Sequence, residues 1–300
     1  MKTRTLTILG LAIVVGLLVA CGGGGSGGGG GGNHPPPPPP TLDEQLRAVI
    51  AAKGLTGDPT TGRGLPSINE PVAQLGKLLF FSKSLSGDMD TACASCHHPA
   101  LGGGDALAMP VGTGAIDPDV VGPGRQRADG LPNVGRHSQS VFNVGLYDAA
   151  MFWDSRVESI GKEAGQNGAG SGIRTPESAL HVADPLVAPG SSLVAAQARF
   201  PVVVPEEMLG SFMPGASPEA VRQRLAERIG DYGAGAGELP NNNWLAAFQA
   251  AFASAAPAEQ LITFDNIALA LGEYQRSMVF VDTPWKAYVQ GDNSAISTSA

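Results

Sequence analysis

The feature that most constrains this chain is the segment CASCH at residues 93–97. Two thiols three positions apart lie on one helical turn, where each can form a thioether with a porphyrin vinyl group, and the adjacent imidazole then lies under the iron. Zinc would need two more soft ligands, but the only other cysteine is Cys21. A thioredoxin-like redox pair would need a βαβ pattern, which the sequence does not show. The segment therefore predicts a haem c attached through Cys93 and Cys96, with His97 as the axial iron ligand.

The N-terminus has the pattern of an export signal. A positively charged start precedes an apolar run over residues 6–20, which is short for a membrane span and typical of a secretory signal peptide. The run ends in Leu-Val-Ala-Cys21, which resembles the lipobox of bacterial lipoproteins. We therefore expect a signal peptide over residues 1–20 and lipidation of Cys21; an ordinary signal peptide with an incidental cysteine is the alternative. The glycine and proline runs within residues 21–40 predict a lipidated tether without packed structure.

These signals predict a periplasmic protein that contacts the membrane through its lipid anchor only. Gly22 follows the lipobox cysteine and favours the outer membrane. The formal net charge is −8, and no cluster of lysine and arginine is present. Nucleic acid is excluded as a partner on this ground, because a phosphate backbone requires clustered positive charge.

From residue 41 onwards the expected fold is mainly α. Thr41 with Glu44 forms a capping box, and Ser217 followed by proline is typical of a helix start. No run of alternating strand residues is found, and the valines at 202–204 are too few for a sheet. The helices are expected over residues 41–52, 69–81, 217–230, 241–254, 264–280 and 284–290. Long loops are expected at about 55–68, 98–135 and 164–200, and loops of that length usually cover a ligand or serve a function.

Four segments carry a family resemblance. They are residues 75–105 around the CASCH motif, residues 135–164 with the element FWDSR, Pro205-Glu206-Glu207-Met208, and residues 262–292. In this order they resemble the N-terminal haem domain of the bacterial di-haem cytochrome c peroxidases, a family that also includes relatives that oxidise residues of partner proteins. The resemblance covers most of residues 70–292.

The resemblance implies a domain plan for the chain. Residues 41–260 would form a peroxidatic cytochrome c-like haem domain with short helices and long loops. Residues 261–300 would form a linking helix and the start of a second cytochrome c domain. No second C-x-x-C-H occurs before Ala300. We therefore expect a truncated chain whose continuation carries a second haem; a single-haem offshoot of the family is the alternative.

The resemblance also implies roles for single residues. Glu207 would be the base that moves a proton between the two oxygens of peroxide, with Glu206 as the rival if the alignment slips by one position. Trp153 would relay electrons between the two haems. Arg136 would contact a haem propionate or the distal pocket, and Arg156 would contact a propionate or position the tryptophan.

The chain departs from the family pattern at several positions. His137 replaces an asparagine that contacts calcium in the family, which leaves calcium binding open. Ser155 replaces a glycine, and Glu163 occupies the place of a glutamine expected ten residues beyond the tryptophan. An inserted loop at about 165–200 separates Glu163 from Glu207.

The expected activity is reduction of hydrogen peroxide with electrons from a small c-type cytochrome or cupredoxin. A close variant would oxidise a side chain of a partner protein. A third possibility is a non-enzymatic, lipid-anchored electron carrier in which a sixth ligand fills the second axial position of the iron. The candidates for that ligand are Met109, Met151, Met208 and Met213. Members of the family are often dimers, so a homodimer is an open expectation.

Overall fold

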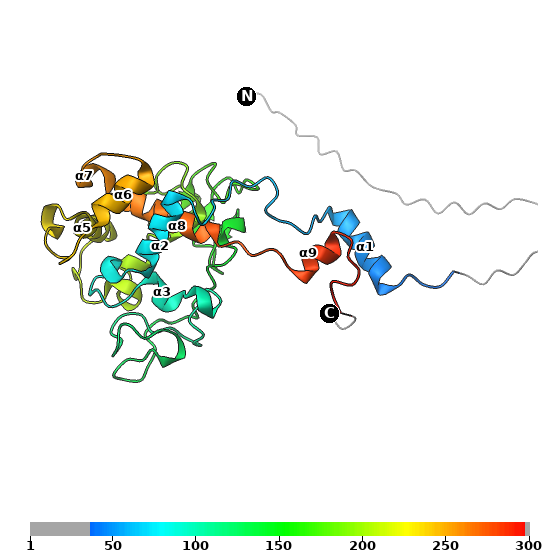
Figure 1. Ribbon diagram of the computed structural model, residues 1–300, viewed down its shortest axis with the longest axis horizontal. Coiled ribbons are helices and arrows are strands. Elements are labelled where there is room, and N and C mark those ends of the chain that lie inside the picture. The colour runs from blue at the N-terminus through cyan, green and yellow to red at the C-terminus, as the bar shows by residue number, and fades with distance from the viewer. Residues whose placement is uncertain (1–36, 298–300) are drawn as a thin grey trace, which may run out of the picture. The chain divides into compact units, whose positions relative to one another are not determined.

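The computed structural model describes residues 37–297 and is mainly helical, as expected (Figure 1). Its α-helices are α1 (Leu42–Lys53), α2 (Pro71–Phe81), α3 (Cys93–Cys96), α4 (Leu193–Gln197), α5 (Pro218–Gly230), α6 (Trp244–Phe252), α7 (Ala258–Leu261), α8 (Phe264–Ser277) and α9 (Pro284–Val289). Single helical turns lie between them at Lys83–Leu85, Pro99–Leu101, Gly122–Gly124, Val144–Leu146, Pro201–Val203, Pro205–Leu209 and Gly233–Gly235.

The chain divides into two compact units, Met1–Ala48 and Val49–Ala300. The expected signal peptide, the lipidation site Cys21 and most of the tether lie outside the described residues. Within residues 37–297, none of the helices combines the length and the apolar character needed to cross a membrane.

The helix starts follow the local rules by which they were predicted. Thr41 and Glu44 form the capping box, because each side chain accepts a hydrogen bond from the backbone N–H of the other residue, at 3.3 Å and 2.7 Å. The Ser217 hydroxyl accepts from the N–H of Ala220 at the start of α5. The helix expected at 241–254 is shorter, Trp244–Phe252. The N-cap position of α2 is Glu70 rather than Asn69, and its side chain makes no capping hydrogen bond.

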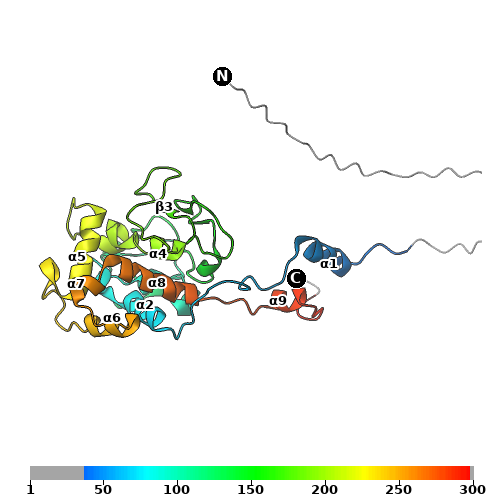
Figure 2. The same cartoon turned by 90° about the horizontal axis from the view of Figure 1, so that it is seen from above.

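Helices α2 and α8 lie side by side at the centre of the second unit (Figure 2). They approach so closely that a β-carbon at Gly76 would clash with the carbonyl oxygen of Ala270. Phe80 packs edge-on against Tyr274 with 5.1 Å between the ring centroids, and both side chains are buried. Although α8 was expected to link two domains, it belongs to the core of this unit. The further division of the chain stays a prediction.

A second, smaller core lies under a three-stranded antiparallel sheet. The strands are β1 (Ala150–Met151), β2 (Val157–Ser159) and β3 (Ile173–Arg174), in that order. These strands were not predicted, because a strand of two or three residues is too short to show alternation. Part of the expected loop at 164–200 is helix α4, which buries Leu193 and Val194 in this core and also packs against α8.

Candidate haem-binding site

A cavity in the second unit brings the predicted site residues together. Cys93, Cys96 and His97 line it, and its atom-free space of about 1160 Å³ includes an open mouth to solvent. Four further residues that were expected to act in catalysis or to contact the haem also line it, namely Arg136, Trp153, Arg156 and Glu207, whereas Glu206, the rival of Glu207, does not. These residues come from segments more than a hundred positions apart. Their roles stay predictions, but their convergence in one cavity is a property of the fold.

The imidazole of His97 is oriented for iron binding. Its Nδ1 lies 2.9 Å from the carbonyl oxygen of Gln139 and 3.3 Å from that of Gly103. Because a carbonyl only accepts, Nδ1 carries the proton and Nε2 keeps its lone pair for a metal. Burial lowers the pKa of His97, which favours the neutral form that iron needs. The neighbouring His98 is not in the cavity lining, and its ring packs edge-on against Phe81.

The two thiols fit covalent attachment of a porphyrin. Cys93 and Cys96 form the two ends of α3 and are not joined by a disulfide. Burial raises the pKa of each thiol to about 12, so both are protonated and neither is a reactive thiolate. Together with the neutral His97 on one wall of a large apolar cavity, this donor set fits a haem c.

Glu207 is the carboxylate that faces the cavity. It lies on the single helical turn Pro205–Leu209, half-buried, whereas Glu206 is exposed and is not part of the lining. Burial raises the pKa of Glu207; the charge of Arg156 lowers it, and the charge of Glu206 raises it further. Of the two neighbouring carboxylates, the geometry therefore favours Glu207 as the group that meets a bound ligand.

The turn that carries Glu207 is held by backbone hydrogen bonds on one side. The carbonyl of Glu206 accepts from the N–H of Thr113 at 3.2 Å and from the Asn133 amide at 3.1 Å. The Thr113 hydroxyl donates to the carbonyl of Pro205 at 2.9 Å. Gly112 lies so close that a β-carbon there would clash with the Glu206 carbonyl. The position of the carboxylate thus depends on the loop at residues 110–114.

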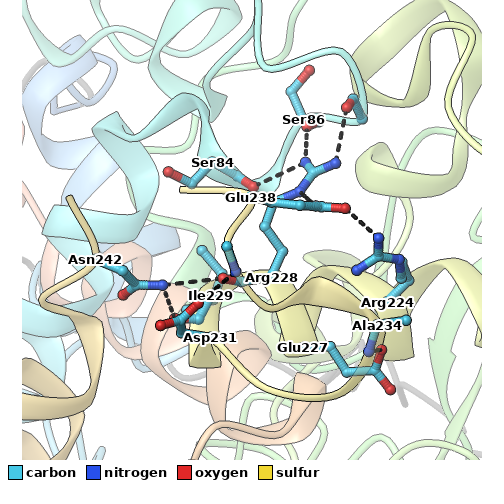
Figure 3. A network of polar contacts seen from close by, with 12 residues as sticks. Ser84, Ser86, Arg224, Glu227, Arg228, Ile229, Asp231, Ala234, Glu238 and Asn242 are labelled. Carbon is cyan, nitrogen blue, oxygen red and sulfur yellow. Dashed lines mark hydrogen bonds and ion pairs between the residues drawn. The ribbon is translucent and has the colours of Figure 1, made fainter. Parts of the chain in front are cut away.

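On its other side this turn is tied to the segment that leads into the haem motif. The N–H of Gly87 donates to the carbonyl of Met208 at 2.7 Å, and the Asp88 carboxylate accepts from the N–H and hydroxyl of Ser211. The buried guanidinium of Arg228 donates to the carbonyls of Ser84, Ser86 and Gly87 (Figure 3). Helix α5 therefore anchors the residues just before α3, with Arg228 in an ion pair to Glu238 at 2.5 Å.

The mouth of the cavity carries arginines and an exposed tryptophan. Trp153 is 72% exposed, and the guanidinium of Arg136 lies 4.5 Å from its ring centroid. Arg156 lies 4.1 Å over Phe152. Ser155, where the family has glycine, adopts φ 54°, the left-handed conformation that glycine enters without strain. A glycine would therefore fit this backbone position without strain.

Two of the four candidate methionine ligands lie in the cavity lining. Met151 and Met208 line the cavity, while Met109 and Met213 do not. His137 also lines it, with Nδ1 2.7 Å from the carbonyl oxygen of Leu107. Within residues 37–297, no group of three or more histidine, cysteine or acidic side chains is arranged to hold a metal ion. Calcium binding stays an open expectation.

Sequence reasoning missed several polar residues of the lining, among them Thr91, Gln197 and Gln275. Gln197, at the end of α4, faces the cavity. Glu163, which was aligned with the family's glutamine, lies outside the lining, and its carboxylate accepts from the Ser171 hydroxyl.

Comparisons with known proteins identify the family of this chain. The family described as Di-haem cytochrome c peroxidase matches residues 70–294, which is more than half of the chain. Cytochrome c551 peroxidase of Pseudomonas aeruginosa is 28% identical over 234 residues, 78% of this chain and 46% of that protein. Methylamine utilization protein MauG of Methylorubrum extorquens is 28% identical over 235 residues, 78% of this chain and 45% of that protein.

Among solved structures, that of a MauG-like protein associated with microbial copper homeostasis covers 80% of this chain and 51% of its own, at 19% identity and a TM-score of 0.45. The chain spans about half the length of the curated relatives it matches. The match over residues 70–294 shows that this chain belongs to the di-haem cytochrome c peroxidase family, a family of c-type haem proteins.

Proposed function

We propose that this chain is the peroxide-reacting haem domain of a lipid-anchored periplasmic peroxidase. The enzyme would reduce hydrogen peroxide with electrons from a small c-type cytochrome or cupredoxin. One observation carries the proposal: the thiols and imidazole of the haem motif share a cavity with the half-buried carboxylate of Glu207. A bound haem would thus meet a proton-transferring group on the wall of its own pocket.

Reduction of hydrogen peroxide to two waters takes two electrons and two protons. When bound, the haem supplies the iron and the redox chemistry. The ionised carboxylate of Glu207 takes the proton from one peroxide oxygen and returns it to the other, which then leaves as water. Burial raises the pKa of Glu207, and a base with a raised pKa holds the transferred proton more readily.

The remaining cavity residues would orient the haem and connect it to its electron source. Arg136 and Arg156 place positive charge at the mouth, where the two propionates of a haem need partners. The exposed ring of Trp153 borders the same mouth and would carry electrons between this haem and a second one in the rest of the protein.

Two other functions compete with this proposal. A non-enzymatic electron carrier is favoured by Met208, which is buried and lines the cavity, because a thioether on the iron would exclude peroxide. Ferric high-spin bands that shift on adding peroxide would support the enzyme, and a purely low-spin, inert spectrum would reject it. Oxidation of a side chain of a partner protein is the other candidate, because the family that this chain resembles in sequence includes relatives with that activity.

Replacing Glu207 tests the catalytic proposal. Glu207→Gln keeps the shape of the side chain but removes the base, so we expect peroxide turnover to fall about 10²–10⁴-fold. The haem content and the spectrum of the resting protein should not change. Turnover is measured with reduced cytochrome c as electron donor, and Glu206→Gln serves as the matched variant. Unchanged turnover in Glu207→Gln with loss in Glu206→Gln would move the base by one position; unchanged turnover in both would remove the proposed mechanism.

The anchor is tested separately. Cys21→Ser should abolish incorporation of labelled palmitate and release the protein into the soluble periplasmic fraction. If the variant stays with the membrane, the lipid anchor is wrong, while the peroxidase proposal stands.

A further inference from the structure

Arg125 is a buried arginine whose hydrogen bonds converge on the haem-attachment region. Its side chain is 2% exposed, although it lies in the long loop at 98–135. Its donors reach five backbone carbonyls and one hydroxyl. The acceptors are Val111 O at 2.8 Å, Gly112 O at 2.7 Å, Pro118 O and Val120 O at 3.2 Å each, Thr91 Oγ1 at 3.3 Å and Asp90 O at 3.4 Å. The whole fork of the guanidinium is therefore satisfied by the chain itself.

The charge of this guanidinium has no direct counterion. Among the described residues, 37–297, no carboxylate lies in an ion pair with Arg125, and Asp90 and Asp117 act on it only through space. Burial lowers the pKa of Arg125, but an arginine starts so high that it stays protonated in proteins. Charges buried without a partner are costly and uncommon. A positive charge held in this way calls for a function.

Arg125 is linked through single backbone carbonyls to two walls of the cavity: the wall that carries Cys96 and the wall that carries Glu207. The carbonyl oxygen of Val111 that accepts from its Nε also lies 3.8 Å from the Cys96 sulfur, so the thiol and the guanidinium meet at the same atom. The next residue, Gly112, packs against the turn that carries Glu207 and accepts from Arg125 Nη2. Thr91, another partner, lines the cavity just before α3.

We propose that Arg125 is a positioning residue that joins the haem-attachment segment to the wall carrying Glu207, and that its buried positive charge raises the reduction potential of the haem iron. Reduction removes one positive charge from the iron, so a nearby fixed positive charge in a weakly screened interior favours the reduced state. The inference rests on the proposed attachment of haem at Cys93, Cys96 and His97. It does not rest on peroxidase activity.

The test is an optical redox titration of the haem-loaded protein. The wave that belongs to this haem is the one missing from the Cys93→Ala/Cys96→Ala variant. In Arg125→Met the charge is lost, and the midpoint potential should shift to a lower value. In Arg125→Lys the charge is kept with fewer donors, so the potential should stay near that of the wild type. Arg125→Gln is neutral but can still donate to a backbone carbonyl, so its midpoint potential should fall as in Arg125→Met. It replaces Arg125→Met if that variant fails to take up haem.

Arg127→Met is the matched control. Arg127 lies two residues away in the same loop, but it is partly exposed and paired with Asp129 at 3.2 Å, so removing its charge should leave the potential almost unchanged. An unshifted potential in a haem-loaded neutral variant would overturn the proposal. Equal shifts in Arg125→Lys and Arg125→Gln would also overturn it, because they would trace the effect to distorted structure rather than charge. If the wild type itself shows no c-type haem spectrum, the proposed haem attachment fails instead.

Discussion

Helices α2 and α8 and the turn that carries Glu207 border the same cavity but are held in different ways. Phe80 of α2 and Leu271 of α8 reach the cavity from a core in which both helices bury apolar side chains against each other. The turn at Pro205–Leu209 buries Met208 in the same core, but hydrogen bonds from irregular segments on both sides also hold it. Substitutions in the packed core of α2 and α8 should therefore destabilise the whole unit. Substitutions that disturb the hydrogen bonds of the turn should displace the Glu207 carboxylate and leave the fold in place.

The largest expected effect comes from truncating the helical wall. Leu79 in α2 is fully buried, whereas its neighbour Leu78 is 57% exposed. Leu79→Ala removes buried methyl groups and leaves a cavity, so we expect the free energy of unfolding to fall by about 2–5 kcal/mol. Leu78→Ala should change it by less than about 0.5 kcal/mol. Urea unfolding of the two haem-loaded variants measures both values, and similar losses in both would show that α2 is not packed as described.

A substitution at the contact between α2 and α8 tests how closely the two helices approach. Alanine is normally favoured over glycine inside a helix by about 0.5–1 kcal/mol. At Gly76, however, the added carbon would clash with the Ala270 backbone, so Gly76→Ala should destabilise by about 1–3 kcal/mol. Gly64→Ala is the control, because nothing lies within 4 Å of its added carbon. A more stable Gly76→Ala protein would mean that the helices lie further apart.

The helices and the haem motif could be predicted from the sequence, because both have local sequence signals. The helices of the first region were predicted because capping residues and proline at helix starts are local signals. The attachment residues Cys93, Cys96 and His97 were equally accessible, since thioether chemistry dictates their spacing. Glu207, Trp153 and the arginines depended on the family resemblance, because a lone Glu-Glu pair has no local pattern that sets it apart from a surface pair.

Most features outside the α2–α8 core could not be predicted from the sequence. Arg125 bonds almost entirely to backbone carbonyls, which leave no trace in residue type, so neither its burial nor its position could be foreseen. Gln197 was missed because no local pattern marks it as a residue of the cavity wall. The three short strands were missed because their pairing depends on tertiary contacts rather than on alternation. In each case the deciding contacts join segments that are distant in the chain.

Gly112→Ala is the counterpart of Gly76→Ala in the irregular region. The added carbon would clash with the Glu206 carbonyl and should push the turn that carries Glu207 out of place. Misplacing a catalytic group by about 1 Å can cost about 10²-fold in rate, so we expect kcat/KM for peroxide to fall by about that factor. The free energy of unfolding should change by only about 1 kcal/mol. A large loss of stability with normal turnover would contradict the contrast between the two regions, and Gly64→Ala again serves as control.

The smallest expected effect concerns the pH dependence of turnover. Besides burial, the negative charge of the exposed Glu206 raises the pKa of Glu207. Only the ionised carboxylate of Glu207 can accept a proton, so kcat/KM should decline as the pH falls through that pKa. Removing the neighbouring charge in Glu206→Gln lowers the pKa of Glu207 and should move this decline to lower pH. The shift should be a fraction of a pH unit and should shrink at high salt, because exposed charges are screened.

Glu219→Gln is the control. It lies at an exposed position at the start of α5, so it removes the same charge away from the cavity and should leave the pH profile in place. A shift to higher pH in Glu206→Gln, or an equal shift in both variants, would show that Glu207 is not the group that titrates.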